Sequence, residues 1–232
     1  MGRNKRPELG VHPLLDRILV NRFLHSEVGD KPMVASMKDV EAMHKQKRVL
    51  VLPKGLRLHT IPKVASTSIS QAMNHLPVDT WNRDWADGGD ANDYRFMVVR
   101  HPSERMRSNY RYFIKEYVPH RFNTQNWQNI GLRPGMPYGE FVDRVCSSPY
   151  FNTHIYPQIY WASVAWGMDR IVKLEALNKV WPSLQERFGY LKDIEVANKT
   201  EDAPDETYEC DEEFIQMIYA HDYEMYWGAE NG

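Results

Sequence analysis

The sequence is poor in cysteine and has no long apolar run. Its 232 residues include two cysteines, Cys146 and Cys210, which lie far apart and form no CxxC motif. This spacing argues against a disulfide framework and against a zinc site, and we expect no metal. The longest apolar passage, Tyr160–Met168, is about half of the ~18 residues that a membrane helix needs. The first residues lack the apolar core of a secretory signal, so we expect a soluble, cytoplasmic protein without an integral membrane segment.

The chain also lacks a large excess of charge of either sign. Its formal net charge is -2. A protein that wraps a duplex usually carries a strong basic excess, so we do not expect nucleic acid as a partner. Although the total charge is nearly neutral, the chain contains a local basic cluster. Residues 95–111 hold five arginines and a single acid, Glu104. Such a cluster suits a small anionic ligand better than a polymer.

What the chain does have is enough apolar material for a core, at 42% of its residues. Short β-like runs alternate with helical patterns along it. The β-like runs are residues 48–52, 56–61, 94–99 and 170–174, and the helical patterns include 66–76, 103–118, 138–145 and 176–188. This alternation predicts an α/β fold with helices on both faces of a mainly parallel central sheet, in three α/β/α layers. We assign residues 1–232 to one domain, with a helical N-terminal extension over 1–48 and a catalytic core over 49–228.

The segment PKVASTS, residues 62–68, carries the first specific signal. It follows a β-like run and precedes a helical pattern. At such a junction free backbone N–H groups converge, and the helix dipole favours negative charge. Ser66, Thr67 and Ser68 add hydroxyl donors and Lys63 adds a positive charge, so the segment predicts a phosphate-binding loop. It contains no glycine and its lysine stands at the beginning, so it is not a Walker A loop. From this segment alone, a capped helix with a surface lysine remains an alternative.

A second segment, residues 94–110, combines a β-like run with an arginine-rich helical pattern. Arg100 directly follows the predicted strand, at the edge where open α/β sheets bind ligands. Ser108 lies eight residues further on, about two helical turns into the next element. A guanidinium group and a hydroxyl can together clamp a phosphate. Two anion sites at one sheet edge predict a ligand that is phosphorylated at both ends.

Both segments resemble motifs of the sulfotransferase family. IPKVASTSI is similar to the family's 5′-phosphosulfate loop, and VVRHPSERMRSNY is similar to its 3′-phosphate motif. The resemblance is closest to the carbohydrate-type (Golgi-type) branch, like sulfotransferase family 2. Weaker similarity in HIYPQ, DRIVKLEAL and the tail at 212–228 extends it over roughly residues 56–228. The resemblance implies the P-loop-NTPase-like fold of these enzymes.

The resemblance also implies an activity. The family transfers a sulfuryl group from 3′-phosphoadenosine 5′-phosphosulfate (PAPS) to an acceptor hydroxyl or amine, and leaves 3′-phosphoadenosine 5′-phosphate (PAP). The acceptor would be a small molecule or a glycan, and no metal is needed. Lys63 would neutralise the leaving phosphate. The residues implied to bind the donor are Lys63, Val64, Ala65, Ser66, Thr67 and Ser68 at the 5′ end, and Arg100 and Ser108 at the 3′ end.

Transfer to a hydroxyl also needs a general base. His154, in the HIYPQ segment, is the first candidate, and the alternative is that it packs against Trp161 or bonds to the backbone. We read His101 and His59 as structural. The aromatic segments at 81–85 and 117–127 could stack on an acceptor, although ordinary loop packing explains them too.

Two other functions remain open from the sequence. A nucleotide kinase of related fold would depend on ATP and magnesium, and the missing Walker A loop argues against it. A non-catalytic PAP-binding protein would not need its catalytic lysine, and the presence of both Lys63 and Arg100 argues against such a degenerate form. The sequence does not indicate the oligomeric state.

Overall fold

The structure is a computed structural model. It describes residues 49–76, 92–115, 130–149, 152–162, 167–195, 208–210 and 212–232, and the backbone of residues 27–28, 31–32 and 82–84. The helices expected within residues 1–48 lie outside this description. The described part of that segment is instead a small antiparallel pair, β1 (Glu27–Val28) and β2 (Lys31–Pro32).

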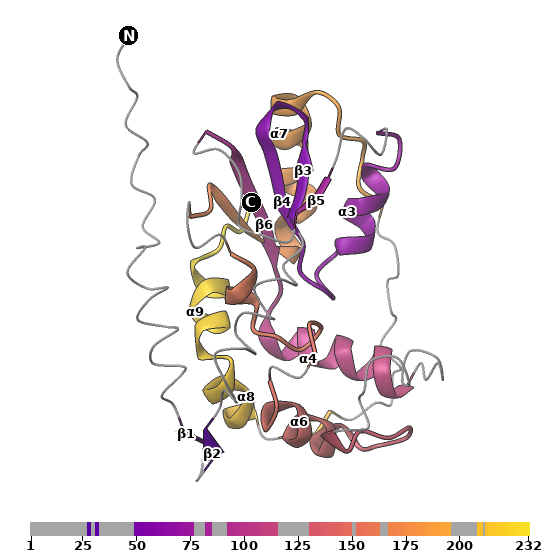
Figure 1. The fold of residues 1–232 in the computed structure, drawn as a ribbon, viewed down its shortest axis with the longest axis vertical. Coiled ribbons are helices and arrows are strands. Elements are labelled where there is room, and N and C mark those ends of the chain that lie inside the picture. Colours follow the sequence, from indigo (N-terminus) through magenta and orange to yellow (C-terminus); the bar gives the residue numbers. More distant parts are fainter. Residues whose placement is uncertain are drawn as a thin grey trace.

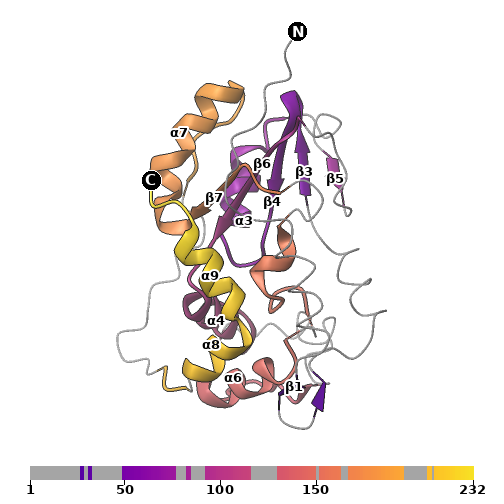
Figure 2. The same ribbon diagram turned by 90° about the vertical axis from the view of Figure 1, so that its left-hand side faces the viewer.

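Among the described residues, five strands form the central sheet, in the order β5-β3-β4-β6-β7 (Figures 1 and 2). They are β3 (Val49–Leu52), β4 (Leu56–His59), β5 (Asn82–Asp84), β6 (Tyr94–Val99) and β7 (Arg170–Lys173). The prediction for β6 is confirmed at both ends, and the predictions for β3, β4 and β7 agree within two residues. The sequence pattern predicts no strand at β5.

The sheet is mixed, so the expectation of a mainly parallel sheet needs correction. Strands β4, β6 and β7 pair in parallel, whereas β3 pairs antiparallel with both β4 and β5. The reason lies in the short turn η1 (Pro53–Gly55) between β3 and β4. A connection of three residues can only reverse the chain, because a parallel crossover needs a dozen residues or more. Lys54 and Gly55 make this turn with φ angles of 59° and 74°.

The parallel pairing of β4 with β6 positions the site. Leu58 lies opposite Phe96, and His59 lies opposite Met97. Both strands therefore end at the same edge of the sheet. The loop after β4 and the residues after β6 are brought side by side there, although about 40 residues separate them in the chain.

Elements cover both faces of the sheet. Helix α7 (Leu177–Phe188) packs on one face, where the rings of Trp181 and Phe96 are 6.5 Å apart. His59 lies in register with Met97 and so faces the other side, where its Nδ1 is 2.7 Å from the carbonyl oxygen of Trp161. Trp161 ends the 3-10 turn η5 (Gln158–Trp161). In the described residues a helix packs on one face and a 3-10 turn lies against the other, so the three α/β/α layers stay a prediction.

Helix α3 (Ser66–Ala72) follows β4 and is tied to the segment after α7. The N–H of Lys192 donates to the carbonyl of Ala72 at 3.4 Å, and the ring of His75 bonds to the carbonyl of Tyr190 at 2.7 Å. Ile69, Ala72 and Met73 join the same apolar cluster as the strands. The helix is therefore anchored at its C-terminal end, while its N-terminus lies toward the edge of the sheet at which β4 and β6 end.

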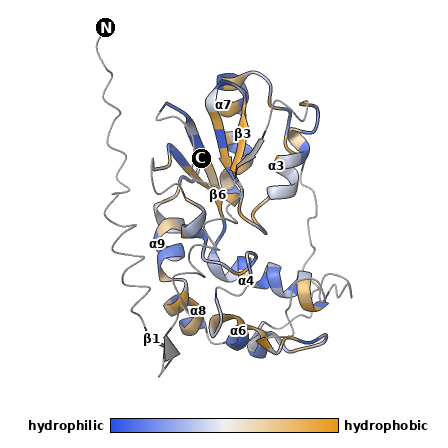
Figure 3. Cartoon of the chain, in the orientation of Figure 1, coloured by the Kyte–Doolittle hydropathy of each residue, from blue (hydrophilic) through white to orange (hydrophobic). Residues whose placement is uncertain are grey.

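A second apolar cluster lies beyond that edge, among the helices drawn below the sheet in Figure 1. These are α4 (Pro102–Tyr110), the π-helical turn η3 (Arg111–Lys115), α6 (Tyr138–Cys146), α8 (Glu212–Ile218) and α9 (Ala220–Gly228). Figure 3 shows hydrophobic colour along β3 and mostly hydrophilic colour on α4. Helix α4 nevertheless buries Arg105 and Asn109, so these polar side chains need partners inside the protein.

Helix α4 begins one residue earlier than the predicted start at Ser103. His101 precedes it as the capping position, and Pro102 occupies its first turn. Proline is well suited there because the N–H that it lacks would have no acceptor within the helix. The predicted helix to residue 118 is described as α4 followed by η3, and residues 116–118 lie outside the description. Within the residues described, no helix combines the length and apolarity required to cross a bilayer.

Candidate active site

The loop between β4 and α3 has an unusual backbone for a segment without glycine. Lys63 and Ala65 both adopt left-handed conformations, with φ angles of 68° and 51°, and Val64 between them does not. Alternation of this kind occurs in anion-binding turns, where successive N–H groups face one side. Here the N–H of Val64 donates to the carbonyl of Ile61 at 3.3 Å, and the first hydrogen bond of α3 runs from the N–H of Ile69 to the carbonyl of Ala65 at 2.9 Å. The backbone donors that the loop could offer to a phosphate therefore do not include the N–H of Val64.

Lys63 points its ammonium group at an aromatic ring that the sequence did not single out. Its Nζ lies 4.2 Å from the centroid of the Tyr112 ring. The same ring stacks on the imidazole of His154, with centroids 5.7 Å apart and planes 18° apart. The two predicted catalytic residues come from distant parts of the chain and contact one tyrosine.

Asn152 orients the imidazole of His154. Its Oδ1 accepts the backbone N–H of His154 at 2.9 Å and lies 3.0 Å from the ring Nδ1. Because the backbone N–H can only donate, the bonded Asn152 atom must be the oxygen, and Nδ1 must then carry a proton. The neutral ring therefore has its basic lone pair on Nε2. This is the tautomer that a general base acting through Nε2 requires.

Arg105 joins this histidine to the loop. Its guanidinium donates to the carbonyl of Pro62 at 3.3 Å and to the carbonyl of His154 at 2.7 Å. Asn109, one turn along α4, donates to the same His154 carbonyl at 2.9 Å. Arg105 is 3% exposed. Burial lowers the pKa of Arg105, and the charge of Asp222 opposes that change. A buried cation thus spans the two segments that carry Lys63 and His154.

Gln158, at the end of the HIYPQ segment, holds the backbone of Arg100. Its Oε1 accepts the N–H of Arg100 at 2.9 Å, and its Nε2 donates to the Arg100 carbonyl at 2.7 Å. Asp222 in α9 in turn accepts the N–H groups of Gln158 and Ile159 at 2.7 and 3.0 Å. The HIYPQ segment therefore places His154 at one end and fixes Arg100 at the other.

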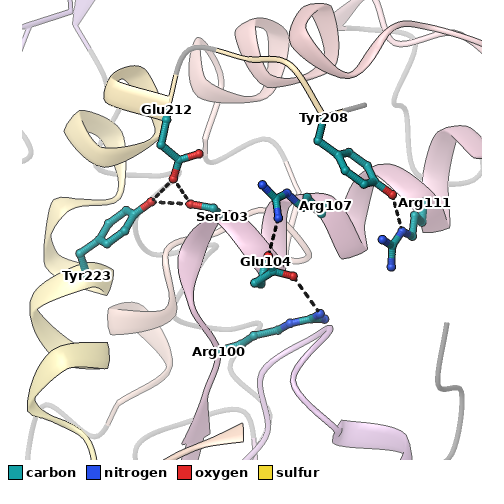
Figure 4. Close-up of polar contacts among 8 residues, drawn as sticks. All are labelled: Arg100, Ser103, Glu104, Arg107, Arg111, Tyr208, Glu212 and Tyr223. Atoms are coloured by element: carbon teal, nitrogen blue, oxygen red, sulfur yellow. Dashed lines mark hydrogen bonds and ion pairs between the residues drawn. The ribbon is translucent and has the colours of Figure 1, made fainter. Parts of the chain in front are cut away.

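The side chain of Arg100 lies beside a carboxylate, as Figure 4 shows. Glu104 is 3.8 Å from the guanidinium of Arg100 and 2.6 Å from that of Arg107. Burial is the main cause of a lowered pKa at Arg100, and the charge of Glu104 opposes it. Ser108 stands one helical turn after Glu104 and is half-buried. Arg100 thus stands directly after β6, Glu104 lies in the first turn of α4, and Ser108 lies one turn further along the same helix.

Comparison with protein-family models gives one decisive result. The model described as "Sulfotransferase family" matches residues 54–227, which is 174 of the 232 residues. The chain belongs to the sulfotransferase family. This confirms the resemblance inferred from the two motifs and supports sulfuryl transfer in general. Neither the search of curated proteins nor the search of solved structures gave a match.

The sulfotransferase loop uses its predicted residues in different ways. The side chain of Val64 is buried in the core at 1% exposure, and its backbone N–H donates to the carbonyl of Ile61 at 3.3 Å. Ser68 is also buried, whereas Ser66 is half-buried and Thr67 is exposed. The sequence pattern does not distinguish between these three hydroxyl donors, but they differ in their exposure to solvent.

The C-terminal helices fasten the start of α4. Glu212 in α8 accepts hydrogen bonds from the hydroxyls of Ser103 and Tyr223, the latter at 2.8 Å (Figure 4). Nearby, Nε of Arg111 donates to the hydroxyl of Tyr208 at 2.6 Å. Glu212 therefore bridges α4 and α9. These contacts hold the tail of the family domain against the helix that carries Ser108.

The remaining candidates from the sequence are two histidines and two aromatic segments. His59 is buried and bonded to the Trp161 carbonyl, and His101 meets the ring edges of Tyr223, Tyr226 and Trp227. These contacts support the structural reading of both. The segment 117–127 lies outside the described residues, and residues 82–84 are described only as the edge strand β5.

We expect Arg105→Met to destabilise the sulfotransferase strongly. Methionine keeps much of the apolar stem but leaves Asp222, which is 1% exposed, without the charge of Arg105. Loss of the guanidinium also leaves the Pro62 carbonyl without this donor, and an unsatisfied buried polar group costs about 1–3 kcal/mol. Thermal or urea unfolding measures the change.

The matched control is Arg170→Met. Arg170 pairs with Glu230 at 2.7 Å near the surface, where the loss costs about 0–1 kcal/mol. Equal destabilisation by the two variants would contradict the role of Arg105 as a buried link.

Proposed function

We propose that the protein transfers a sulfuryl group from PAPS to an acceptor hydroxyl, on a carbohydrate or another small molecule. The observation that carries the proposal is the meeting of Lys63 and His154 at one ring, next to the left-handed turn at Lys63 and Ala65. Family membership supports the reaction type. The donor and the acceptor class rest on the motif resemblance together with this geometry.

Two cationic positions at the ligand edge suit a nucleotide that is phosphorylated at both ends. Backbone N–H groups of the loop, the hydroxyls of Ser66, Thr67 and Ser68, and Lys63 would hold the 5′-phosphosulfate. Arg100 and Ser108 would hold the 3′-phosphate. The hydrogen bonds between the Gln158 side chain and the Arg100 backbone fix the backbone from which the Arg100 side chain extends. The parallel register of β4 and β6 brings these two groups to neighbouring strand ends.

The chemistry assigns a distinct task to each catalytic side chain. The acceptor oxygen forms a bond to sulfur while the bond from sulfur to the bridging phosphate oxygen breaks. Nε2 of His154 takes the proton of the acceptor hydroxyl, since Nδ1 is already protonated against Asn152. Lys63 stabilises the negative charge that develops on the departing phosphate oxygen. The products are a sulfate ester and PAP, and the proton on His154 balances the reaction.

The first test is Lys63→Ala. Loss of the ammonium removes stabilisation of the leaving phosphate, which is worth roughly 100- to 1000-fold in rate for comparable preorganised donors. We expect that loss in the transfer of radiolabelled sulfur from PAPS to a panel of glycans, phenols, lipids and peptides. PAP should still raise the melting temperature of the variant.

Lys179→Ala is the control, because Lys179 is exposed on α7, away from the loop. Full activity in Lys63→Ala would contradict the proposal. So would a wild-type protein that binds PAP and transfers sulfur to no acceptor.

The second test concerns selection of the 3′-phosphate. Arg100→Ala should weaken PAP binding by roughly 10- to 100-fold, the value of a hydrogen bond to a charged group. Binding of adenosine 5′-phosphate, which lacks the 3′-phosphate, should barely change. Calorimetry on both ligands gives the ratio, with Arg187→Ala at the opposite end of the sheet as the control. An equal loss of affinity for both nucleotides would show that Arg100 does not bind the 3′-phosphate.

The third test addresses the base. His154→Gln should lower acceptor-dependent transfer by roughly 100- to 10,000-fold with unchanged PAP affinity. In the wild type, protonation of the imidazole at acid pH removes the base, so the rate should rise with pH over that range. The rate of the His154→Gln variant should not show this rise with pH. A pH–rate profile that keeps the same rise in His154→Gln would assign the base to another group.

A further inference from the structure

The ring of Tyr112 is the meeting point of the candidate site. It contacts the ammonium of Lys63 at 4.2 Å and stacks within 18° of the His154 plane. The edge of Phe113 also meets the imidazole, with centroids 5.2 Å apart and an interplanar angle of 88°. Neither the phosphate motifs nor the proposed chemistry assigns a task to Tyr112.

The local backbone is organised to present this ring. Arg105, Asn109 and Tyr112 are spaced by four and three residues, so they follow one side of the helix. The first two bond to the His154 carbonyl, and the third contacts its ring. Tyr112 lies in the π-helical turn η3, directly after α4. Such turns are rare and occur frequently at functional sites.

An aromatic ring can hold the ammonium group of Lys63 without neutralising its charge. A carboxylate partner would offset the lysine's charge, whereas the ring attracts the ammonium through its quadrupole and leaves the full charge available. The attraction is also weak enough for the ammonium to move to a phosphate oxygen. The ring also stabilises the imidazolium that forms when His154 accepts a proton.

We propose that Tyr112 is a positioning residue. Its ring holds the ammonium of Lys63 and the imidazole of His154 in fixed positions relative to each other and to the sulfuryl group that is transferred. The proposal rests on the sulfuryl transfer proposed above. It requires the aromatic face of Tyr112 and does not require the hydroxyl. Phenylalanine at this position should therefore keep the function, and leucine should lose it.

The kinetic test compares Tyr112→Leu, Tyr112→Phe and the control Tyr94→Leu. Tyr94 also carries a cation over its ring, with Arg187 at 4.1 Å, but it stands at the other end of β6. We expect Tyr112→Leu to lower kcat roughly three- to thirty-fold, the value of one or two cation–π contacts, with unchanged PAP affinity. Tyr112→Phe and Tyr94→Leu should stay within about twofold of the wild type. A kcat of Tyr112→Leu equal to that of the wild type would overturn the proposal, as would an equal loss in Tyr112→Phe.

A second readout does not depend on turnover. Protons next to the Lys63 ammonium lie over the ring and should show upfield-shifted NMR resonances in the wild type and in Tyr112→Phe. In Tyr112→Leu the shift should vanish, and the His154 ring resonances should move as well. If the wild-type protein transfers no sulfur, the function proposal fails, and these resonances still decide whether Tyr112 holds both side chains. Resonances that are the same in all three proteins would overturn the positioning role.

Discussion

A buried guanidinium is the constraint on which the site depends. Arg105 bonds at once to the loop that carries Lys63 and to the segment that carries His154. Its charge is opposed by Asp222, whose carboxylate also holds the start of η5 through two N–H groups. A lone charge in this interior would cost several kcal/mol, so the groups around Arg105 must keep their places together. Loop, helix α4 and the C-terminal helix α9 therefore form one unit.

The fold was predictable where the information is local. The strand over 94–99 holds the apolar run 96–99, and the helices over 138–145 and 176–188 have clear apolar faces, so these elements follow from the pattern. The direction of β3 depends on the length of one turn, and reading every strand as part of a parallel α/β sheet missed it. The start of α4 at Pro102 depends on the special fit of proline to a first helical turn.

The site was predictable only in part for a related reason. Motifs spaced along the chain identify Lys63, Arg100 and Ser108, because strand ends and helix starts have local signatures. The contacts of Tyr112 with Lys63 and His154 join segments that are 40 to 50 residues apart, and a single sequence carries no record of such pairings. The nearest signal was the aromatic pair at 112–113 directly after the arginine motif. Glu104 was noticed only as the one acid in a basic stretch, and its contacts with Arg100 and Arg107 appear only in the structure.

The glycine-free loop shows how tertiary contacts permit a strained backbone. Left-handed residues other than glycine cost about 1–2 kcal/mol each, and Lys63 and Ala65 are both of this kind. Such conformations persist only where the surroundings determine them. Here the side chain of Val64 is locked in the core, and the carbonyl of Pro62 is bonded to Arg105. The fixed neighbours on both sides of Lys63 thus offset the strain, so the left-handed turn at Lys63 and Ala65 is a product of the packed fold and not of its local sequence.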